Sequence, residues 1–293
     1  MLKELEWVDF LKEKVKKGKD VLVGIGDDCA LVKIGKENVL LKSDLFIEGV
    51  HFPAIGGSAF GGKQKKISFK TIGMRAVARV LSDFAACGGI PKFIGVSAGV
   101  PSHIKEKQLI RILAGILYYG KKYNFSLVGG DTAKSSKLFL DIWGIATAKK
   151  FIKRSSARVG DYIFITGRLG MRKFCDAFEP RIEIAQYLIR NFKINAMIDI
   201  SDGFILDLYR ILKESKKGAI VYKENIPVTK GELDFYRGED YELIFTVDQN
   251  ESRIEHLKKK FYHVGVIKSR NFGYKMQIDS RVYKIEPKGY LHF

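Results

Sequence analysis

Hydrophobic residues recur along the chain in two patterns: at every third or fourth position in some stretches, and in short unbroken runs in others. The first pattern is typical of a helix with one buried face, and the second is typical of a strand. In the first half they predict helices over 3–17, 67–88 and 105–123, and strands over 20–26, 30–34, 38–47, 92–101, 125–132 and 138–148.

The second half repeats this mixture after a basic link, "KKFIKRSSARVGD". The patterns there predict strands over 161–167, 195–201, 219–224, 240–248 and 263–268, and helices over 181–192, 202–215 and 250–261. We therefore predict an α/β (α+β) protein with two domains, residues 1–149 and 150–293. The segment 47–66, rich in glycine and then in lysine, is predicted to be a loop.

Composition adds few constraints. A chain of 293 residues with 46% apolar content can bury a sizeable core. No apolar run reaches the length of about 18 residues that suggests a membrane span, and the N-terminus lacks the apolar core of a signal peptide, so we expect a cytoplasmic protein without a membrane partner. Cys29, Cys87 and Cys175 follow no metal-binding or disulfide pattern, and we expect buried, reduced thiols.

The formal net charge of +18 raises the question of a nucleic-acid partner. No segment interleaves basic with aromatic residues as nucleic-acid-binding modules do. The lysines stand in short runs that are typical of solvated surfaces. We therefore expect no nucleic-acid partner, and a positive field that helps to attract anionic metabolites.

Acidic residues end several apolar strands and interrupt one apolar helix. They are Asp27, Asp28, Asp44, Asp83, Asp131, Asp199 and Asp202. A turn or a helix cap explains any one of them, but an isolated carboxylate is costly to bury. Several Mg²⁺ ions held by oxygen ligands are the most economical common cause.

Two glycine turns suit a phosphate beside such metals. In "GIGDDCA" and "LVGGDT" the glycines would let the backbone approach a phosphate, with a metal between that phosphate and Asp28 or Asp131. Arg154 is a candidate for direct phosphate contact. Asp27 either ligates a metal or holds the turn, and the sequence leaves both readings open.

Two common nucleotide motifs do not fit. The segment "GSAFGGKQ", residues 57–64, has P-loop spacing, but Gln64 stands where Ser or Thr should be and no strand precedes it. The turn at Gly24 lacks the third glycine of a dinucleotide site, because Cys29 replaces it. No nucleophile motif is present either. Phosphoryl transfer, which needs alignment and charge neutralisation more than a covalent catalyst, is therefore favoured.

Seven motifs together resemble those of the thiamine-monophosphate kinase family. In order they are "GIGDDCA", "SDLFIEGVHF", "LSDFAACGGIP", "LVGGDT", "IDISDGFILDL", "GEDYELIFTV" and "KGYLHF". The resemblance implies ATP-dependent phosphorylation of thiamine monophosphate to thiamine diphosphate by direct in-line transfer. It also implies the aminoimidazole-ribonucleotide-synthetase-like fold, with N-terminal α/β domains paired in a homodimer and a C-terminal α+β domain.

The resemblance further implies the roles of individual residues. The implied Mg²⁺ ligands are Asp28, Ser43, Asp44, Asp83, Asp131 and Asp199, with Asp202 serving another metal. The implied ATP contacts are Gly130, Asp131, Arg154 and Ser201. The implied contacts to thiamine monophosphate are His51, Glu239 and Tyr290.

The residues themselves allow other interpretations. His51 could cap a loop, Glu239 could pair with Arg237, and Tyr290 could be a packing residue. Lys42 stands where family members often carry a small hydroxyl residue: either one metal ligand is missing, or the ammonium group takes the place of a cation. The alternative functions are another ATP-using synthetase of the superfamily, of the purine-pathway type, and a non-catalytic nucleotide- or polyanion-binding protein.

Overall fold

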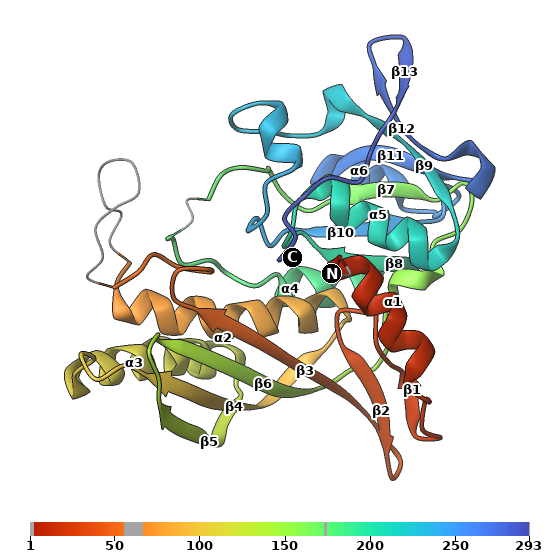
Figure 1. The fold of residues 1–293 in the computed structure, drawn as a ribbon. Coiled ribbons are helices and arrows are strands. Elements are labelled where there is room, and N and C mark those ends of the chain that lie inside the picture. Colours follow the sequence, from red (N-terminus) through yellow and green to blue (C-terminus); the bar gives the residue numbers. More distant parts are fainter. Residues whose placement is uncertain (1–2, 56–66, 173–174, 293) are drawn as a thin grey trace.

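The computed structural model describes residues 3–55, 67–172 and 175–292. Its helices within these ranges are α1 (Glu4–Lys14), α2 (Phe69–Ala86), α3 (Glu106–Tyr123), α4 (Ile182–Asn191), α5 (Phe204–Ser215) and α6 (Ile254–Lys260). The strands form two mixed sheets, one in each half of the chain, as Figure 1 shows. The P-loop-like segment 57–64 lies outside the described residues.

The first sheet has six strands and carries helices on one face. Its strands, in spatial order, are β1 (Val21–Val23), β2 (Ala30–Ile34), β3 (Glu37–Ile47), β6 (Phe139–Thr147), β4 (Ile90–Val100) and β5 (Ser126–Lys134). Neighbours are antiparallel except β4 and β5, which are parallel. Helix α2 begins after Ser68, whose hydroxyl accepts a hydrogen bond from the Thr71 amide. The predicted apolar stripe of α2, including Ile72 and Phe84, is fully buried against the sheet.

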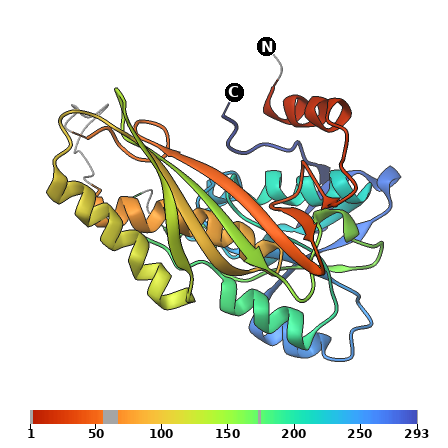
Figure 2. The same cartoon turned by 90° about the horizontal axis from the view of Figure 1, so that it is seen from below.

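None of the helices in the described part of the chain covers the opposite face of this sheet. In Figure 2 the strands β3, β4 and β6 lie in front, with α2 and α3 behind them. Successive side chains of a strand point to opposite faces, so Leu41 and Leu45 of β3 lie on the open face. These two side chains are 37% and 49% exposed, and Phe93 on β4 is 45% exposed. The open face is therefore partly apolar.

The second sheet has seven strands. Their spatial order is β13 (Arg281–Lys284), β12 (Tyr274–Ile278), β9 (Gly218–Tyr222), β11 (Tyr262–Lys268), β7 (Tyr162–Ile165), β10 (Leu243–Val247) and β8 (Ile194–Asp199). All neighbours are antiparallel except β12 and β9. Helix α5 packs on β8, and α6 packs on β11. Strands β12 and β13 were not predicted from the sequence. Strand β13 is exposed throughout and has no buried face to give a pattern, whereas β12 buries Tyr274 and Met276.

Helix α2 joins the two halves. It contacts β3 and β6 of the first sheet and also β8 and α4 of the second half. The apolar core is continuous there, since Leu40 and Phe84 belong to the same buried cluster as Met197 and Phe245. The sheets divide between β6 and β7, near the predicted boundary at 149, and the division into two domains stays a prediction.

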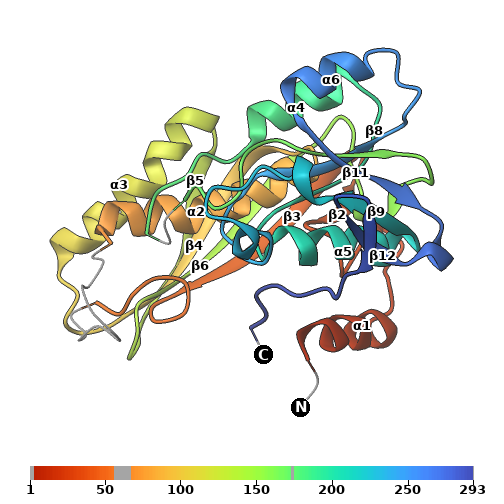
Figure 3. The same ribbon diagram turned by 90° about the horizontal axis from the view of Figure 1, so that it is seen from above.

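Helix α1 lies against α5 through charged residues. Lys12 bonds Glu214 of α5, and Lys213 of α5 lies 2.6 Å from Asp9. The predicted helix is confirmed, but it ends at Lys14 and none of its residues is buried. The two ends of the chain lie close together in Figure 3, where the His292 amide donates to the Glu4 carboxylate.

Two further expectations concern thiols and membranes. Cys29 and Cys87 are buried as expected, but the expectation is wrong for Cys175, which is only half-buried. None of the helices in the described ranges has both the length and the apolar content that a membrane crossing requires.

Candidate functional site

Three buried carboxylates from distant parts of the sequence meet beside α2. Asp28 lies in the turn between β1 and β2, Asp83 lies in α2, and Asp199 is the last residue of β8. One ligand oxygen of each lies within 4.8 Å of the others. Their residues are 2%, 7% and 2% exposed. Two of the acidic residues that follow or end strands, Asp28 and Asp199, therefore form one cluster with the acidic helix position Asp83.

Two carboxylates of this cluster, Asp83 and Asp199, are costly to ionise without added cations. Burial, and then the charge of Asp28, raises the pKa of Asp199 to about 7. Burial raises the pKa of Asp83 well above its usual value, even though Lys42 acts in the opposite direction. Three buried oxygen donors in mutual repulsion fit a divalent cation such as Mg²⁺, which would remove that cost.

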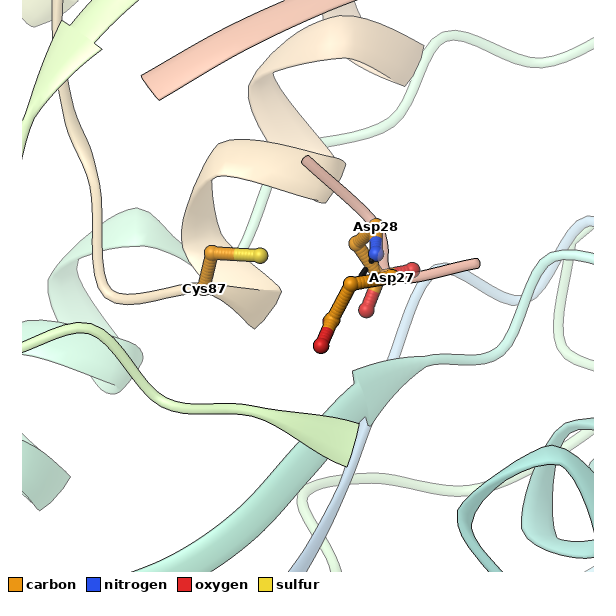
Figure 4. A group of neighbouring side chains, drawn as sticks. All are labelled: Asp27, Asp28 and Cys87. Atoms are coloured by element: carbon orange, nitrogen blue, oxygen red, sulfur yellow. Dashed lines mark hydrogen bonds between the residues drawn. The ribbon is translucent and has the colours of Figure 1, made fainter. Parts of the chain in front are cut away.

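Figure 4 shows the turn that carries Asp27 and Asp28, with the Cys87 thiol at the end of α2 pointing toward them. The Asp27 carboxylate accepts hydrogen bonds from the backbone amides of Asp28 (3.0 Å) and Arg154 (3.2 Å). This arrangement favours the interpretation that Asp27 holds the turn. Because Mg²⁺ prefers oxygen ligands, the all-carboxylate group suits it better than the group that includes Cys87.

Arg154 binds Asp28 directly. Its Nε lies 3.1 Å from Asp28 Oδ2, and its terminal nitrogen bonds the other carboxylate oxygen. Arg154, which the sequence suggested for phosphate contact, thus lies beside Asp28, one of the predicted metal ligands. A guanidinium group that holds a carboxylate in two bonds fixes its orientation.

Asp44 and Lys42 lie next to the cluster on β3. They are two residues apart, so both side chains point toward α2. The Lys42 amino group lies 3.0 Å from Asp83 and 3.3 Å from Asp44, and Arg79 lies 3.5 Å from Asp44. Burial opposes ionisation of Asp44, but Lys42 and Arg79 outweigh it and lower the pKa of Asp44.

The "SDG" turn before α5 supplies Ser201 and Asp202. The buried Asp207 carboxylate accepts hydrogen bonds from the amides of Asp202 and Gly203, which fixes the turn at the start of the helix. Arg210 lies 2.6 Å from Asp202. Asp202 therefore has a cationic partner of its own, separate from the three-carboxylate cluster.

These residues line a cavity of about 360 Å³, which we call the carboxylate pocket. Its lining includes the predicted residues Asp28, Asp44, Asp83, Arg154, Asp199, Ser201 and Asp202. A second cavity of about 400 Å³ adjoins it, and we call it the basic pocket. Its charged and aromatic lining includes His51, Arg79, Arg172, Lys230, Arg237, Glu239, Tyr290 and His292. The two pockets share Arg79, Ser201, Asp202 and His292.

His51 in the basic pocket has a defined tautomer. Its Nδ1 accepts a hydrogen bond from the Ile47 amide at 3.0 Å, so the proton is on Nε2. Burial, and then the charge of Arg79, lowers the pKa of His51 to about 4. Among the described residues Nε2 has no hydrogen-bond partner. His51 therefore caps a turn, as the alternative reading stated, and also keeps one buried donor free.

Glu239 does not pair with Arg237, contrary to the alternative interpretation. Its carboxylate bonds Arg75 and lies 3.2 Å from Arg79 Nη1, and it accepts a hydrogen bond from the Tyr241 hydroxyl at 3.0 Å. Its backbone φ of 74° shows that the loop before β10 is sharply turned at this residue. Arg237 lines the same pocket as a separate cation.

Three predicted site residues line neither pocket. Ser43 neighbours Asp44 on β3 but points to the open face, where its hydroxyl donates to Asp141 at 2.6 Å. Asp131 pairs with Ser97 across β4 and β5, and it is exposed. Gly130 has a structural role, because a Cβ there would overlap the Val96 carbonyl. The proposed metal and ATP roles of these residues stay predictions.

The sequence interpretation missed Arg75, Arg79 and Tyr241. A signal was present: Arg75, Arg79 and Asp83 follow one another at intervals of four in a helix whose other inward positions are apolar. Residues four apart share a helix face, so this spacing indicates a charged stripe toward the site.

Part of the chain matches a known family of proteins. Residues 26–148 match the family model described as "AIR synthase related protein, N-terminal domain". A chain of the HypE–HypF complex has a similar structure, with a TM-score of 0.74 over 97% of this chain and 99% of that one. The two sequences are 18% identical, so this similarity supports the fold alone. The chain thus has the fold of AIR-synthase-related proteins, as expected, and residues 26–148 match the N-terminal domain of that class.

Comparison over the full length is more specific. The thiamine-monophosphate kinase of Buchnera aphidicola subsp. Acyrthosiphon pisum is 33% identical, over 97% of this chain and 96% of that one. That of Bacillus subtilis is 28% identical over 99% of both. A structure described as "AaThiL complexed with AMPPCP and TMP" matches with a TM-score of 0.82 at 25% identity, over 100% and 97%. The chain belongs to the thiamine-monophosphate kinase family.

Proposed function

We propose that the protein transfers the terminal phosphoryl group of ATP to thiamine monophosphate and so forms thiamine diphosphate. The observation that carries this proposal is the adjacency of the two pockets. An acid-lined cavity suited to metal-bound polyphosphate adjoins a cation-lined cavity suited to a phosphate-bearing acceptor, and Arg79 lines both. Family membership, and the nucleotide analogue and TMP named for the AaThiL structure, support the same assignment.

The basic pocket would bind thiamine monophosphate. Arg172, Lys230 and Arg237 offer positive charge to its phosphate group. The free Nε2–H of His51 can donate a hydrogen bond, and the half-exposed ring of Tyr290 offers a surface for stacking. Glu239 would face the cationic thiazolium or accept from the aminopyrimidine. Its bonds to Arg75 and Arg79 would hold it in position.

The carboxylate pocket would hold ATP together with several Mg²⁺ ions. We propose Asp28, Asp44, Asp83, Asp199 and Asp202 as ligands, with Ser43 and Asp131 contributing from the open face. Arg154, Ser201 and Gly130 would contact the nucleotide. When bound, Mg²⁺ would neutralise part of the negative charge of the polyphosphate.

The transfer itself would be direct. An oxygen of the acceptor phosphate forms a bond to the γ-phosphorus of ATP, the bond to the β-γ bridging oxygen breaks, and ADP leaves. Arg79 lies where both pockets meet and would balance the negative charge of the two phosphate groups as they approach. No side chain needs to carry the phosphoryl group.

We further propose a homodimer formed through the open face of the first sheet. This face exposes Leu41, Leu45 and Phe93, and no helix covers it in Figure 2. Exposed apolar patches of this kind are typical of protein interfaces. Such pairing would cover the side of the sheet on which Ser43 lies. A cytoplasmic location stays a prediction.

Chromatography of the reaction products tests the proposal. The protein is incubated with ATP, Mg²⁺ and, in separate reactions, thiamine monophosphate, thiamine or aminoimidazole-ribonucleotide-pathway substrates. We expect thiamine diphosphate from the first acceptor. Absence of product at several temperatures, beside an active control enzyme, would exclude the kinase. Asp44→Asn should lose most activity while remaining folded, whereas a purely structural Asp44 would mainly affect the melting temperature.

A further inference from the structure

The amino group of Lys42 lies inside the carboxylate pocket. Lys42 and Asp44 both point from β3 toward α2, and the amino nitrogen lies 3.3 Å from Asp44 Oδ1 and 3.0 Å from Asp83 Oδ2. The Lys42 side chain is 22% exposed, so the charged end is directed into the protein and away from bulk water. This is the reverse of the usual behaviour of lysine at a surface.

The position of this nitrogen excludes a second cation between the same two carboxylates. Mg²⁺ needs its ligand oxygens at about 2.0–2.1 Å, so an ion bridging Asp44 and Asp83 would occupy the space that the ammonium group now fills. The Lys42 ammonium group and a divalent ion between the same two carboxylates would also repel each other strongly. Either the lysine or a bridging divalent ion can be there.

Two arginines of the pocket lining are paired with carboxylates. Arg154 bonds Asp28, and Arg210 bonds Asp202. Asp199, by contrast, forms no ion pair within the described ranges and accepts only the Ser82 hydroxyl. Asp199 is thus the carboxylate of the three-carboxylate cluster that has no cationic partner among the described residues, and it is the one left to attract a divalent ion.

We propose that Lys42 is a permanent cation of the metal site. It takes one position that a divalent ion would otherwise fill between Asp44 and Asp83, and it holds these two carboxylates in place before ATP and Mg²⁺ bind. The protein therefore binds one divalent ion fewer than the same site with a small hydroxyl residue at position 42. This inference rests on the proposed function of the pocket, because it assumes that the neighbouring carboxylates bind divalent ions.

Counting bound Mn²⁺ tests the inference without turnover. Mn²⁺ prefers the same oxygen ligands as Mg²⁺, and its free form is measured by electron paramagnetic resonance. We compare the full-length protein with Lys42→Ser, which vacates the position and supplies a hydroxyl oxygen, and with Lys42→Arg, which keeps a cation. We expect about one additional Mn²⁺ per chain for Lys42→Ser and no additional ion for Lys42→Arg.

Thermal melting gives a second readout. Removing the ammonium group leaves Asp44 and Asp83 facing each other, so Lys42→Ser should melt below the unsubstituted protein in a chelator and gain more from added Mn²⁺. Equal Mn²⁺ counts for Lys42→Ser and the unsubstituted protein would overturn the inference, as would a Lys42→Ser protein that Mn²⁺ fails to stabilise. If the unsubstituted protein forms no thiamine diphosphate, the proposed function is contradicted. The Mn²⁺ counts would still test the role of Lys42 independently of that result.

Discussion

Replacing Asp199 with asparagine should stabilise the metal-free protein. Asp199 is 2% exposed and pairs with no cation among the described residues, and burial raises its pKa from 3.8 to about 7. A carboxyl group that is harder to ionise in the folded state than in the unfolded state costs stability once the pH exceeds its unfolded pKa. Asparagine has nearly the same shape and can still accept the hydrogen bond from Ser82.

The size of the effect follows from the pKa shift. Three pKa units correspond to about 4 kcal/mol, since each unit is worth about 1.36 kcal/mol. The cost disappears below about pH 3, where both states are protonated, is still below about 1 kcal/mol at pH 4, grows as the pH rises toward 7, and stays constant above 7. At pH 8 in a chelator, Asp199→Asn should therefore raise the melting temperature by roughly 8 °C, and at pH 4 by much less.

Melting curves from pH 4 to pH 8, with EDTA and with excess Mg²⁺, measure this prediction. Mg²⁺ should stabilise the unsubstituted protein by about 2.7 kcal/mol at a hundredfold excess over its dissociation constant, and should stabilise the variant less. The exposed Asp20→Asn is the matched control and should show no pH-dependent difference. A variant that melts no higher than the unsubstituted protein at pH 8 in EDTA would refute the idea that Asp199 is strained by uncompensated charge.

Three further outcomes follow from the contacts of single residues. His51→Asn keeps an acceptor for the Ile47 amide, but its shorter side chain cannot place a donor at the position of Nε2. KM for thiamine monophosphate should therefore rise about three- to tenfold while KM for ATP stays constant. Because the His51 pKa is about 4, titration of His51 should change neither KM between pH 6 and pH 8. Arg154→Met leaves Asp28 buried without its partner and should cost about 3–5 kcal/mol in urea melts, partly restored by Mg²⁺. Phe93→Glu on the open face should convert a dimer to a monomer in analytical ultracentrifugation, and an unchanged sedimentation coefficient would argue against pairing through that face.

Much of the fold could be predicted because the relevant signals are local. Helix α2 follows from its apolar stripe, and the long strands β3 and β6 follow from their apolar runs. The missed strand β13 is exposed throughout, so its sequence carries little hydrophobic pattern. Strand β12 does alternate, with Tyr274 and Met276 buried, and that signal was overlooked. Helix α1 was recognised, but its contacts with α5 are charged and gave no indication of where it would lie.

The sequence could predict most residues of the candidate site, but not which cation each carboxylate contacts. Asp28, Asp83 and Asp199, which were singled out in the sequence after a strand, in a helix and at a strand end, lie together in the structure. Some of the cations that these carboxylates contact come from distant segments, as Arg154 does for Asp28, and no signal in the sequence indicated that pairing. Strand alternation could have shown that Ser43 and Asp44 point to opposite faces, and that signal was overlooked.

The central claim is that one site joins ATP to thiamine monophosphate by direct transfer. A single-turnover reaction with ATP labelled in its γ-phosphate, stopped at successive times and separated into protein and small molecules, tests it most directly. The label should pass from ATP to thiamine diphosphate at the rate at which ADP appears, and the protein should remain unlabelled throughout. Label that accumulates on the protein, or that appears only as inorganic phosphate, would contradict the account.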